Sequence, residues 1–282
     1  MEILRHVIEH SIEHSIPLLP FLFLTYLLME YIEHKTGEGV AKVLAGAGRV
    51  GPAAGGILGI LPQCGMSAAA SSLYAGRIIT LGTLMAIYLS TSDEMLPIML
   101  SQSVEAGTIA KILCLKAGIG MAAGFLIDIA LRLRGKKAEE LKIHGMCEHE
   151  HCGCEGGIVR SALHHTIRIF GFILLITAIL NLGLELLGED SLFWTALSQP
   201  VIGPLLAGII GLIPNCAASV VITEMYLSEA IGFGTMMAGL LVGAGVGIMV
   251  LLRVNERKKE SLSIIGLLYV IGVVSGGLLN LL

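Results

Sequence analysis

The fold is decided by a stretch that occurs twice, GPAAGGILGILPQCGMSAAASSLYAGRIITLGTLMAIYL at residues 51–89 and GPLLAGIIGLIPNCAASVVITEMYLSEAIGFGTMMAGLL at residues 203–241. The offset is 152 residues, and 16 of the 50 positions between 51 and 100 are identical to their partners. Shared apolar composition does not align prolines and cysteines, as in Pro62/Pro214 and Cys64/Cys216. The same offset continues downstream through Gly120/Gly272, Gly124/Gly276 and Asp128/Asn280. The chain therefore contains a duplication.

The composition predicts a polytopic membrane protein. Of the 282 residues, 55 % are hydrophobic and 14 % are charged, and the mean hydropathy is +0.83. Soluble domains have about 45–50 % apolar and about 25 % charged residues. The N-terminus lacks the pattern of a cleavable signal peptide. We expect the lipid bilayer of an inner or plasma membrane as partner. A net charge of −4 without a basic, aromatic-rich patch argues against nucleic acid, and the oligomeric state stays open.

Each half contains five apolar segments. They cover residues 16–32, 50–62, 65–78, 80–101 and 107–131, and then 161–187, 199–213, 216–230, 231–252 and 261–282. The second and third of each half are shorter than the roughly 20 residues that a membrane helix needs. They are expected to form broken or re-entrant helical hairpins, although two full crossings would give the same count. Each half then crosses an odd number of times, which inverts one half relative to the other.

The expected fold class is an all-α polytopic membrane protein with two inverted five-segment repeats. The first repeat covers residues 1–133, a His/Cys-rich linker covers 134–157, and the second repeat covers 158–282. Lysine and arginine gather on one side, which the positive-inside rule assigns to the cytoplasm. The linker is then cytoplasmic and both termini are outside. The residues that set this orientation are Lys35, Lys42, Arg49, Arg77, Arg132, Arg134, Lys136, Lys137, Lys142, Arg253, Arg257, Lys258 and Lys259.

Two adjacent acids, Asp93 and Glu94, interrupt the apolar segment 80–101. A charge at mid-bilayer costs at least about 2.5–3.5 kcal/mol, so these acids need a partner or a wet cavity. With the hydroxyls of Ser90, Thr91 and Ser92 they predict a cation site, to which both acids can contribute only if the helix is broken there. The matching stretch, VGAGVG at 242–247, has glycines that would allow close backbone approach. The alternative is a structural pair between a buried acid and Lys111 or Lys116.

Further candidate ligands lie in the two hairpins. Cys64 and Cys216 occupy matching tips, where thiolates would select soft metals, or where they are simply small buried side chains. The other candidates for the transport path are Gln63, Asn215, Ser67, Ser219 and the third intramembrane acid, Glu224.

Two polar clusters outside the apolar segments also have metal-binding composition. The linker, which otherwise would be a plain solvated loop, carries the candidate ligands His144, Cys147, His149, His151, Cys152 and Cys154. The N-terminal segment places the residues His6, Glu9, His10, Glu13 and His14 on one helical face. Its repeated H-x-x-E-H spacing matches an inverted metalloprotease signature, but a peripheral cation patch or an interfacial amphipathic helix also fits.

The segments LPQCGMSAAASSLYAGRI, STSDEMLP and IPNCAASVVITEMY, together with the His/Cys linker, resemble the family of ten-helix heavy-metal exporters. Its members carry the labels arsenic efflux protein or manganese transporter. The resemblance spans nearly the whole chain and implies export of a metal or metalloid across a bacterial or archaeal membrane.

Paired short, Gly/Pro-interrupted segments in two repeats are themselves a sign of a secondary transporter. No phosphate-binding glycine-lysine loop is present, so the chain is not expected to be an ATPase or other enzyme, and no cofactor is required beyond metal held by the linker. We expect alternating access with cation-for-proton exchange. The acids favour a divalent cation such as manganese, and the cysteines favour a soft metal or an arsenical. The alternatives are an intramembrane metal-dependent hydrolase that uses the N-terminal His/Glu face, and a membrane metal sensor.

Overall fold

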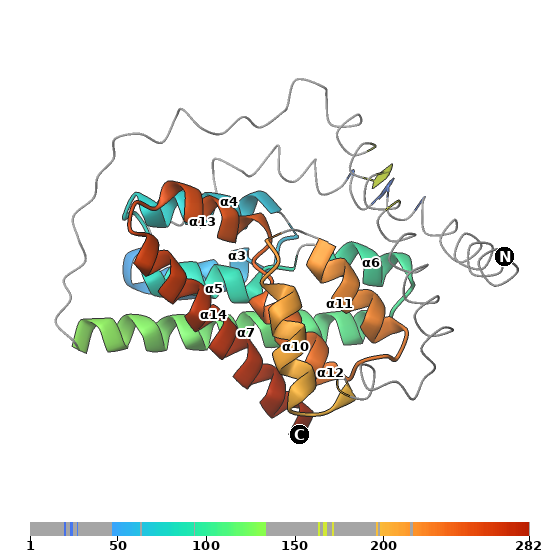
Figure 1. Ribbon diagram of the computed structural model, residues 1–282. Helices are drawn as coiled ribbons and strands as arrows, with labels where there is room; N and C mark the ends of the chain where they lie inside the picture. The colour runs from blue at the N-terminus through green and yellow to red at the C-terminus, as the bar shows by residue number, and fades with distance from the viewer. Residues whose placement is uncertain are drawn as a thin grey trace, which may run out of the picture.

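A computed structural model describes residues 47–62, 64–92, 94–133, 198–214 and 217–281, with a few single positions within 20–27 and 163–196. All regular structure in these residues is helical, and no strand occurs among them (Figure 1). Apart from those single positions, the first apolar segment of each half lies outside this part of the chain, as do the N-terminal His/Glu face and the His/Cys linker. The expectation of an all-helical protein is therefore confirmed for the described residues.

The same series of helices occurs in both halves. After the 3₁₀ turn η1 (Gly48–Val50), the first half contains α3 (Gly51–Leu58), α4 (Cys64–Ala75), α5 (Leu81–Ser90), α6 (Met95–Ser101) and α7 (Ala106–Leu133). The second half contains α10 (Ile202–Gly211), α11 (Ala217–Leu227), α12 (Phe233–Val242), α13 (Val246–Val254) and α14 (Lys258–Leu281). Shifted by 152 residues, α5 coincides with α12, and each other helix overlaps its partner. The duplication in sequence is thus a duplication of helices.

The fourth apolar segment of each half forms two helices instead of one. The first, α5, ends at Ser90, because its C-cap Thr91 has a non-helical ψ of 131°, and α6 begins after Glu94. The second, α12, ends at Gly243, and α13 begins after Gly245, whose φ of 52° lies in the left-handed region that favours glycine. Both breaks fall at matching places in the repeat, so each half has a discontinuous helix.

These discontinuous helices form the centre of the described structure. Every residue from Gly82 to Ser90 and from Gly234 to Val242 is buried. The neighbours of α5 are α3 and α7, and those of α12 are α10 and α14, while α4 packs along α13 (Figure 1). The short helices α3, α4, α10 and α11 have 8, 12, 10 and 11 residues. At about 1.5 Å per residue none of them reaches across a hydrocarbon core of about 30 Å.

Glycine pairs bring the long helices into backbone contact with the discontinuous ones. A Cβ on Gly124 of α7 would lie 2.5 Å from the carbonyl oxygen of Gly82, and Gly276 of α14 has the same relation to Gly234. Beside the first pair, the Asp128 carboxylate accepts hydrogen bonds from the Gly82 amide at 2.9 Å and from Thr80 at 2.6 Å. The carboxylate therefore caps α5 at its positive end.

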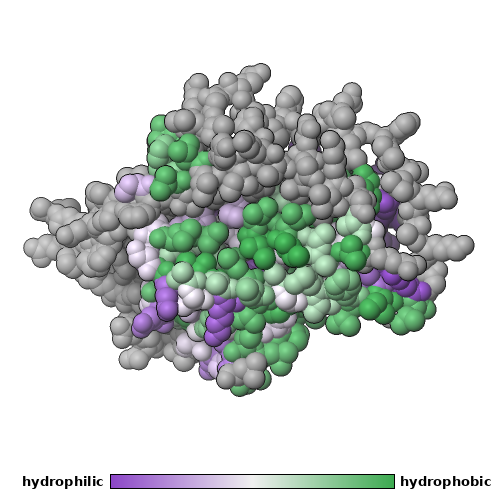
Figure 2. Space-filling model, turned by 180° about the vertical axis from the view of Figure 1, so that it is seen from behind, coloured by the Kyte–Doolittle hydropathy of each residue, from purple (hydrophilic) through white to green (hydrophobic). Residues whose placement is uncertain are grey.

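Three helical segments among the described residues are long and apolar enough to cross a membrane. They are Ala106–Leu133, Phe233–Val254, which includes the break after α12, and Lys258–Leu281. Large apolar side chains such as Leu126, Val274 and Leu278 are exposed on the outer faces of α7 and α14. The space-filling view shows a broad apolar band across the described surface (Figure 2). A band of this kind suits lipid better than water.

The glycine contact gives a stability prediction with a control in the same helix. Gly124→Ala should lower the stability by about 1–3 kcal/mol, because the methyl group would meet the Gly82 carbonyl and Pro52. Gly118→Ala on α7 should be neutral or stabilising by about 0.5–1 kcal/mol, because nothing lies within 4 Å of its Cβ position. Thermal unfolding of the purified variants in detergent measures both. Equal stability of the two variants would contradict the close packing of α5 against α7.

Candidate ion-binding site at the paired helix breaks

The two helix breaks are joined by one buried lysine. Lys116 lies in the middle of α7 and its side chain is 1 % exposed. Its ammonium donates a hydrogen bond to the carbonyl oxygen of Thr91, the C-cap of α5. It donates a second hydrogen bond, of 2.8 Å, to the carbonyl oxygen of Leu240 in the last turn of α12. A single positive charge therefore connects the C-terminal ends of both discontinuous helices.

The chemistry of this position is that of a cation site. The last carbonyl groups of a helix have no intrahelical partner, and they carry the negative end of the helix dipole. Two such ends converge on the Lys116 ammonium. Unwound carbonyls and half-helix C-terminal ends are the groups that hold ions in discontinuous-helix transporters. Of the two lysines that the sequence offered as partners, Lys116 is at the break, whereas Lys111 is exposed and lies over the Phe233 ring at 5.4 Å.

The hydroxyls before the acids are buried and ordered by backbone hydrogen bonds. Ser90 donates to the Ala86 carbonyl at 2.7 Å, Thr91 donates to Ile87 at 2.7 Å, and Ser92 donates back to Ser90 at 3.2 Å. A hydroxyl that donates its hydrogen keeps its oxygen lone pairs, which can accept from a donor or contact a cation. Glu94 is 3 % exposed and stands at the N-terminal end of α6. Asp93 lies outside the described residues, so its place in this group stays a prediction.

The second half meets this region through glycine. A Cβ on Gly247, the repeat partner of Met95, would lie 2.7 Å from the Ser67 Cβ and 2.9 Å from the Ser67 carbonyl oxygen. The expected close backbone approach is therefore present between α13 and α4. The Gly247 carbonyl accepts hydrogen bonds from Ser71 at 2.8 Å and from Tyr88 at 3.1 Å, and these two hydroxyls lie 2.6 Å apart. This buried network ties α4 and α5 to the break of the other half.

Glu224 lies at the end of α6 opposite to Glu94. It is buried on α11 and accepts a hydrogen bond of 2.8 Å from Gln102, the C-cap of α6. Gln102 is about 12 Å along α6 from Glu94, at about 1.5 Å per residue. The described contacts thus place Glu224 at the other end of α6, while Ser219 is buried about one and a half turns earlier in α11. Glu224 and Glu94 are therefore connected through α6.

The remaining candidate ligands stay predictions. Gln63, Asn215 and Cys216 lie outside the described residues, and of Cys64 only its place at the first position of α4 is described. The linker ligands and the N-terminal His/Glu face are also outside. Within the described ranges, no group of three or more His, Cys, Asp or Glu side chains forms a metal-binding cluster.

Two features of the site were not assigned from the sequence, although the repeat alignment contains a signal for them. Lys116 aligns with Leu268, a buried leucine of α14, so the repeat replaces an apolar core residue by a charge. Tyr88 aligns with Leu240 in the same way. At both positions the first half therefore places a polar side chain where the second half has a leucine.

No family model, no curated protein and no solved structure matches the chain.

The repeat predicts opposite effects for two equivalent hydroxyls. Ser71→Ala should cost about 1–3 kcal/mol, because it removes a hydroxyl that joins Tyr88 and Gly247. Its partner, Thr223, is the buried side-chain donor without a hydrogen bond among the described residues, so Thr223→Val should leave stability unchanged or raise it by about 1 kcal/mol. Thermal unfolding of both variants in detergent is the measurement. A loss for Thr223→Val as large as that for Ser71→Ala would contradict the assigned network.

Proposed function

We propose that the protein is a secondary membrane transporter that exports a heavy-metal or metalloid ion by alternating access. The observation that carries the proposal is the pair of discontinuous helices whose carbonyl ends meet at the buried Lys116 ammonium. Irregular backbone inside a membrane protein is tolerated where it lines a cavity or an ion site. A structural scaffold has no need for two helix breaks in register together with a fully buried charge.

The proposed site combines acids from the first half with backbone groups from both halves. Asp93 and Glu94 supply charge, and the hydroxyls of Ser90, Thr91 and Ser92 supply oxygen ligands. In this arrangement Lys116 is a tethered cation that occupies the carbonyl ends when no ion is bound. An arriving cation competes with this ammonium, and protonation of the site would couple metal export to proton entry. Glu224, at the other end of α6, provides a second ion-binding position along the same path.

The proposed architecture is that of two inverted repeats in a bacterial or archaeal inner membrane. The recurring helix order and the short α3/α4 and α10/α11 pairs support it, since neither pair is long enough for two crossings. The resemblance to ten-helix heavy-metal exporters points the same way. In this topology the His/Cys linker is cytoplasmic, where it captures metal for delivery to the pore.

Two classes of substrate follow from the candidate ligands. Carboxylates, hydroxyls and carbonyls suit a divalent cation such as manganese, and thiolates from Cys64 and Cys216 suit zinc or trivalent arsenic. The described oxygen groups gather around the helix breaks, which favours the divalent cation. The cysteine pair would then adjust selectivity.

The function is tested by measuring the uptake of manganese, zinc and arsenite into everted membrane vesicles. Wild type should accumulate one of these ions, and Asp93→Asn should reduce accumulation by about ten- to hundredfold, because a ligand with a full charge contributes roughly 1.5–3 kcal/mol. Asp128→Asn is the matched control. Asp128 is a buried carboxylate of the same half, its repeat partner is Asn280, and an amide can still cap α5.

The outcomes separate the substrate classes. If Asp93→Asn transports like wild type, the acidic pair is not the ion site. If the double variant Cys64→Ser/Cys216→Ser fails only with zinc or arsenite, the soft-metal assignment holds instead. Absence of uptake of all three ions by folded wild type would contradict the proposed export.

A further inference from the structure

The turns after α4 and α11 are equivalent in backbone and different in side chains. Arg77 and Glu229 are repeat partners, and both have a left-handed φ, of 62° and 60°. In both turns the amide of this residue donates to the carbonyl of a tyrosine three residues earlier, Tyr74 in one and Tyr226 in the other, at 2.9 and 3.0 Å. A comparison of the two turns therefore isolates what their side chains do.

The first turn is closed against α14 by an ion pair. The Arg77 guanidinium donates two hydrogen bonds of 2.8 Å, one to each carboxylate oxygen of Glu260. The Tyr74 hydroxyl donates to the same carboxylate, and the guanidinium lies 5.3 Å from the Tyr74 ring. The hydrogen bond with Glu260 raises the pKa of Arg77, so the guanidinium stays charged. We call Tyr74, Arg77 and Glu260 the latch.

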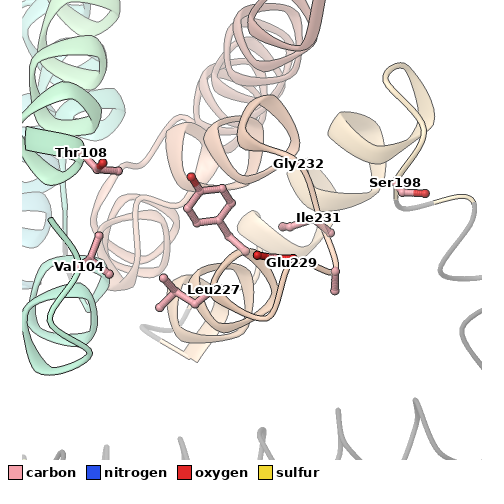
Figure 3. Close-up of a pocket in the computed structure, with 9 residues that line it drawn as sticks. Val104, Thr108, Ser198, Leu227, Glu229, Ile231 and Gly232 are labelled. Carbon is pink, nitrogen blue, oxygen red and sulfur yellow. The ribbon is translucent and has the colours of Figure 1, made fainter.

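The second turn borders an open pocket at the matching place. Shifted by 152 residues, the latch positions become Tyr226, Glu229 and Thr108, and all three line a cavity of about 430 Å³. Figure 3 shows Val104 and Thr108 on one wall, with Leu227, Glu229 and Gly232 on the facing wall. Thr108 has no charge to pair with Glu229. The end that is latched in one half is therefore open in the other.

Helix packing has the same asymmetry. At the latched end α4 packs along α13, and Gly247 lies against Ser67. At the pocket end the equivalent helices, α11 and α6, pack less extensively, and Gln102 at the end of α6 donates a hydrogen bond to Glu224 of α11. Two repeats with the same backbone thus adopt one closed and one open arrangement.

We infer that the pocket is the open access route of a cation to the central site, and that the latch is the closed route of the same path. This inference rests on the proposed transport function. The exposed Glu229 carboxylate and the hydroxyls of Tyr226 and Thr108 give the pocket a cation-attracting wall. Thr108 lies on the same helix as Lys116, about 12 Å along α7 from it, so α7 joins the pocket to the paired breaks. Glu260 of the latch directly follows the basic stretch Arg257–Lys259, which the positive-inside rule assigns to the cytoplasm. The open route, at the matching end of the inverted repeat, then faces outside.

The two routes exchange when the latch opens. Closing the pocket would bring Glu229 toward α7, where Lys111 lies one turn beyond Thr108 with its ammonium over the Phe233 ring. The Glu229–Lys111 pair then takes the place that Arg77–Glu260 holds in the present state. The charges of the two pairs are reversed between the repeats. In the first pair the turn carries the positive charge and the long helix the negative one, and in the second pair the turn carries the negative charge.

Cysteine labelling at the two repeat-equivalent tyrosines tests this inference without a substrate. Tyr226→Cys in the pocket should react quickly with a membrane-impermeant maleimide from the outer side. Tyr74→Cys, which leaves the Arg77–Glu260 pair intact, should react slowly from the other side. Adding Glu260→Gln should raise labelling at position 74 and lower it at position 226, each by about three- to tenfold, as expected for loss of a partly exposed bidentate pair. Lys259→Gln, on the exposed neighbour of Glu260, is the matched control.

A charge swap separates gating from general damage. Arg77→Glu combined with Glu260→Arg should restore slow labelling at position 74, whereas either change alone should not. If Glu260→Gln leaves both rates within about twofold of the parent, the latch does not control access. If Glu260→Gln raises labelling at position 74 and lowers it at position 226 but wild type transports no metal, the gate is retained and the proposed function is rejected. If wild type transports metal but Glu260→Gln leaves both labelling rates unchanged, the proposed function is retained and the gate is rejected.

Discussion

The structure depends on the burial of the Lys116 ammonium. A charged group taken out of water is costly unless hydrogen-bond partners replace its hydration. A continuous helix offers no free carbonyls, because each one is bonded to the amide four residues later. Lys116 finds its acceptors in Thr91 and Leu240 because α5 and α12 both stop at this level. The helix breaks, the contact that α7 makes with α12 through Lys116, and the buried charge are therefore parts of one arrangement.

The two repeats contribute different chemical groups to this centre. The first half contributes the charged and hydroxylated groups, with Glu94 buried at the start of α6 and Lys116 in α7. The second half contributes backbone, since Gly247 allows contact with Ser67 and its carbonyl accepts from Ser71 and Tyr88. The unpaired hydroxyl of Thr223 follows from this division. Ser71 has hydrogen-bond partners in Tyr88 and Gly247. At the equivalent positions around Thr223 the repeat has Leu240 and Met95, whose side chains offer no such hydrogen bond.

Much of the described fold could be predicted from the sequence because the repeat fixes it. The offset of 152 residues gives the helix order, and the short hairpin helices follow from segment length and the Pro62 and Pro214 tips. The breaks were expected only as a condition for Asp93 and Glu94 to share one site. The role of Lys116 could not be derived, since a lysine in an apolar helix fits several buried partners until the long-range contact to Leu240 is known. The latch between Arg77 and Glu260 was missed for the same reason, because its residues are far apart in sequence and belong to different halves.

Equilibrium binding of manganese and zinc to purified wild type and Lys116→Gln tests the central claim most directly. Glutamine keeps hydrogen-bond donors for the two carbonyls but removes the charge. If the ammonium occupies the ion site, the folded variant should bind the preferred cation at least about tenfold more tightly, which corresponds to about 1.4 kcal/mol of removed competition. Unchanged or weaker binding by a variant whose thermal stability matches wild type would contradict the placement of the ion site at the paired helix breaks.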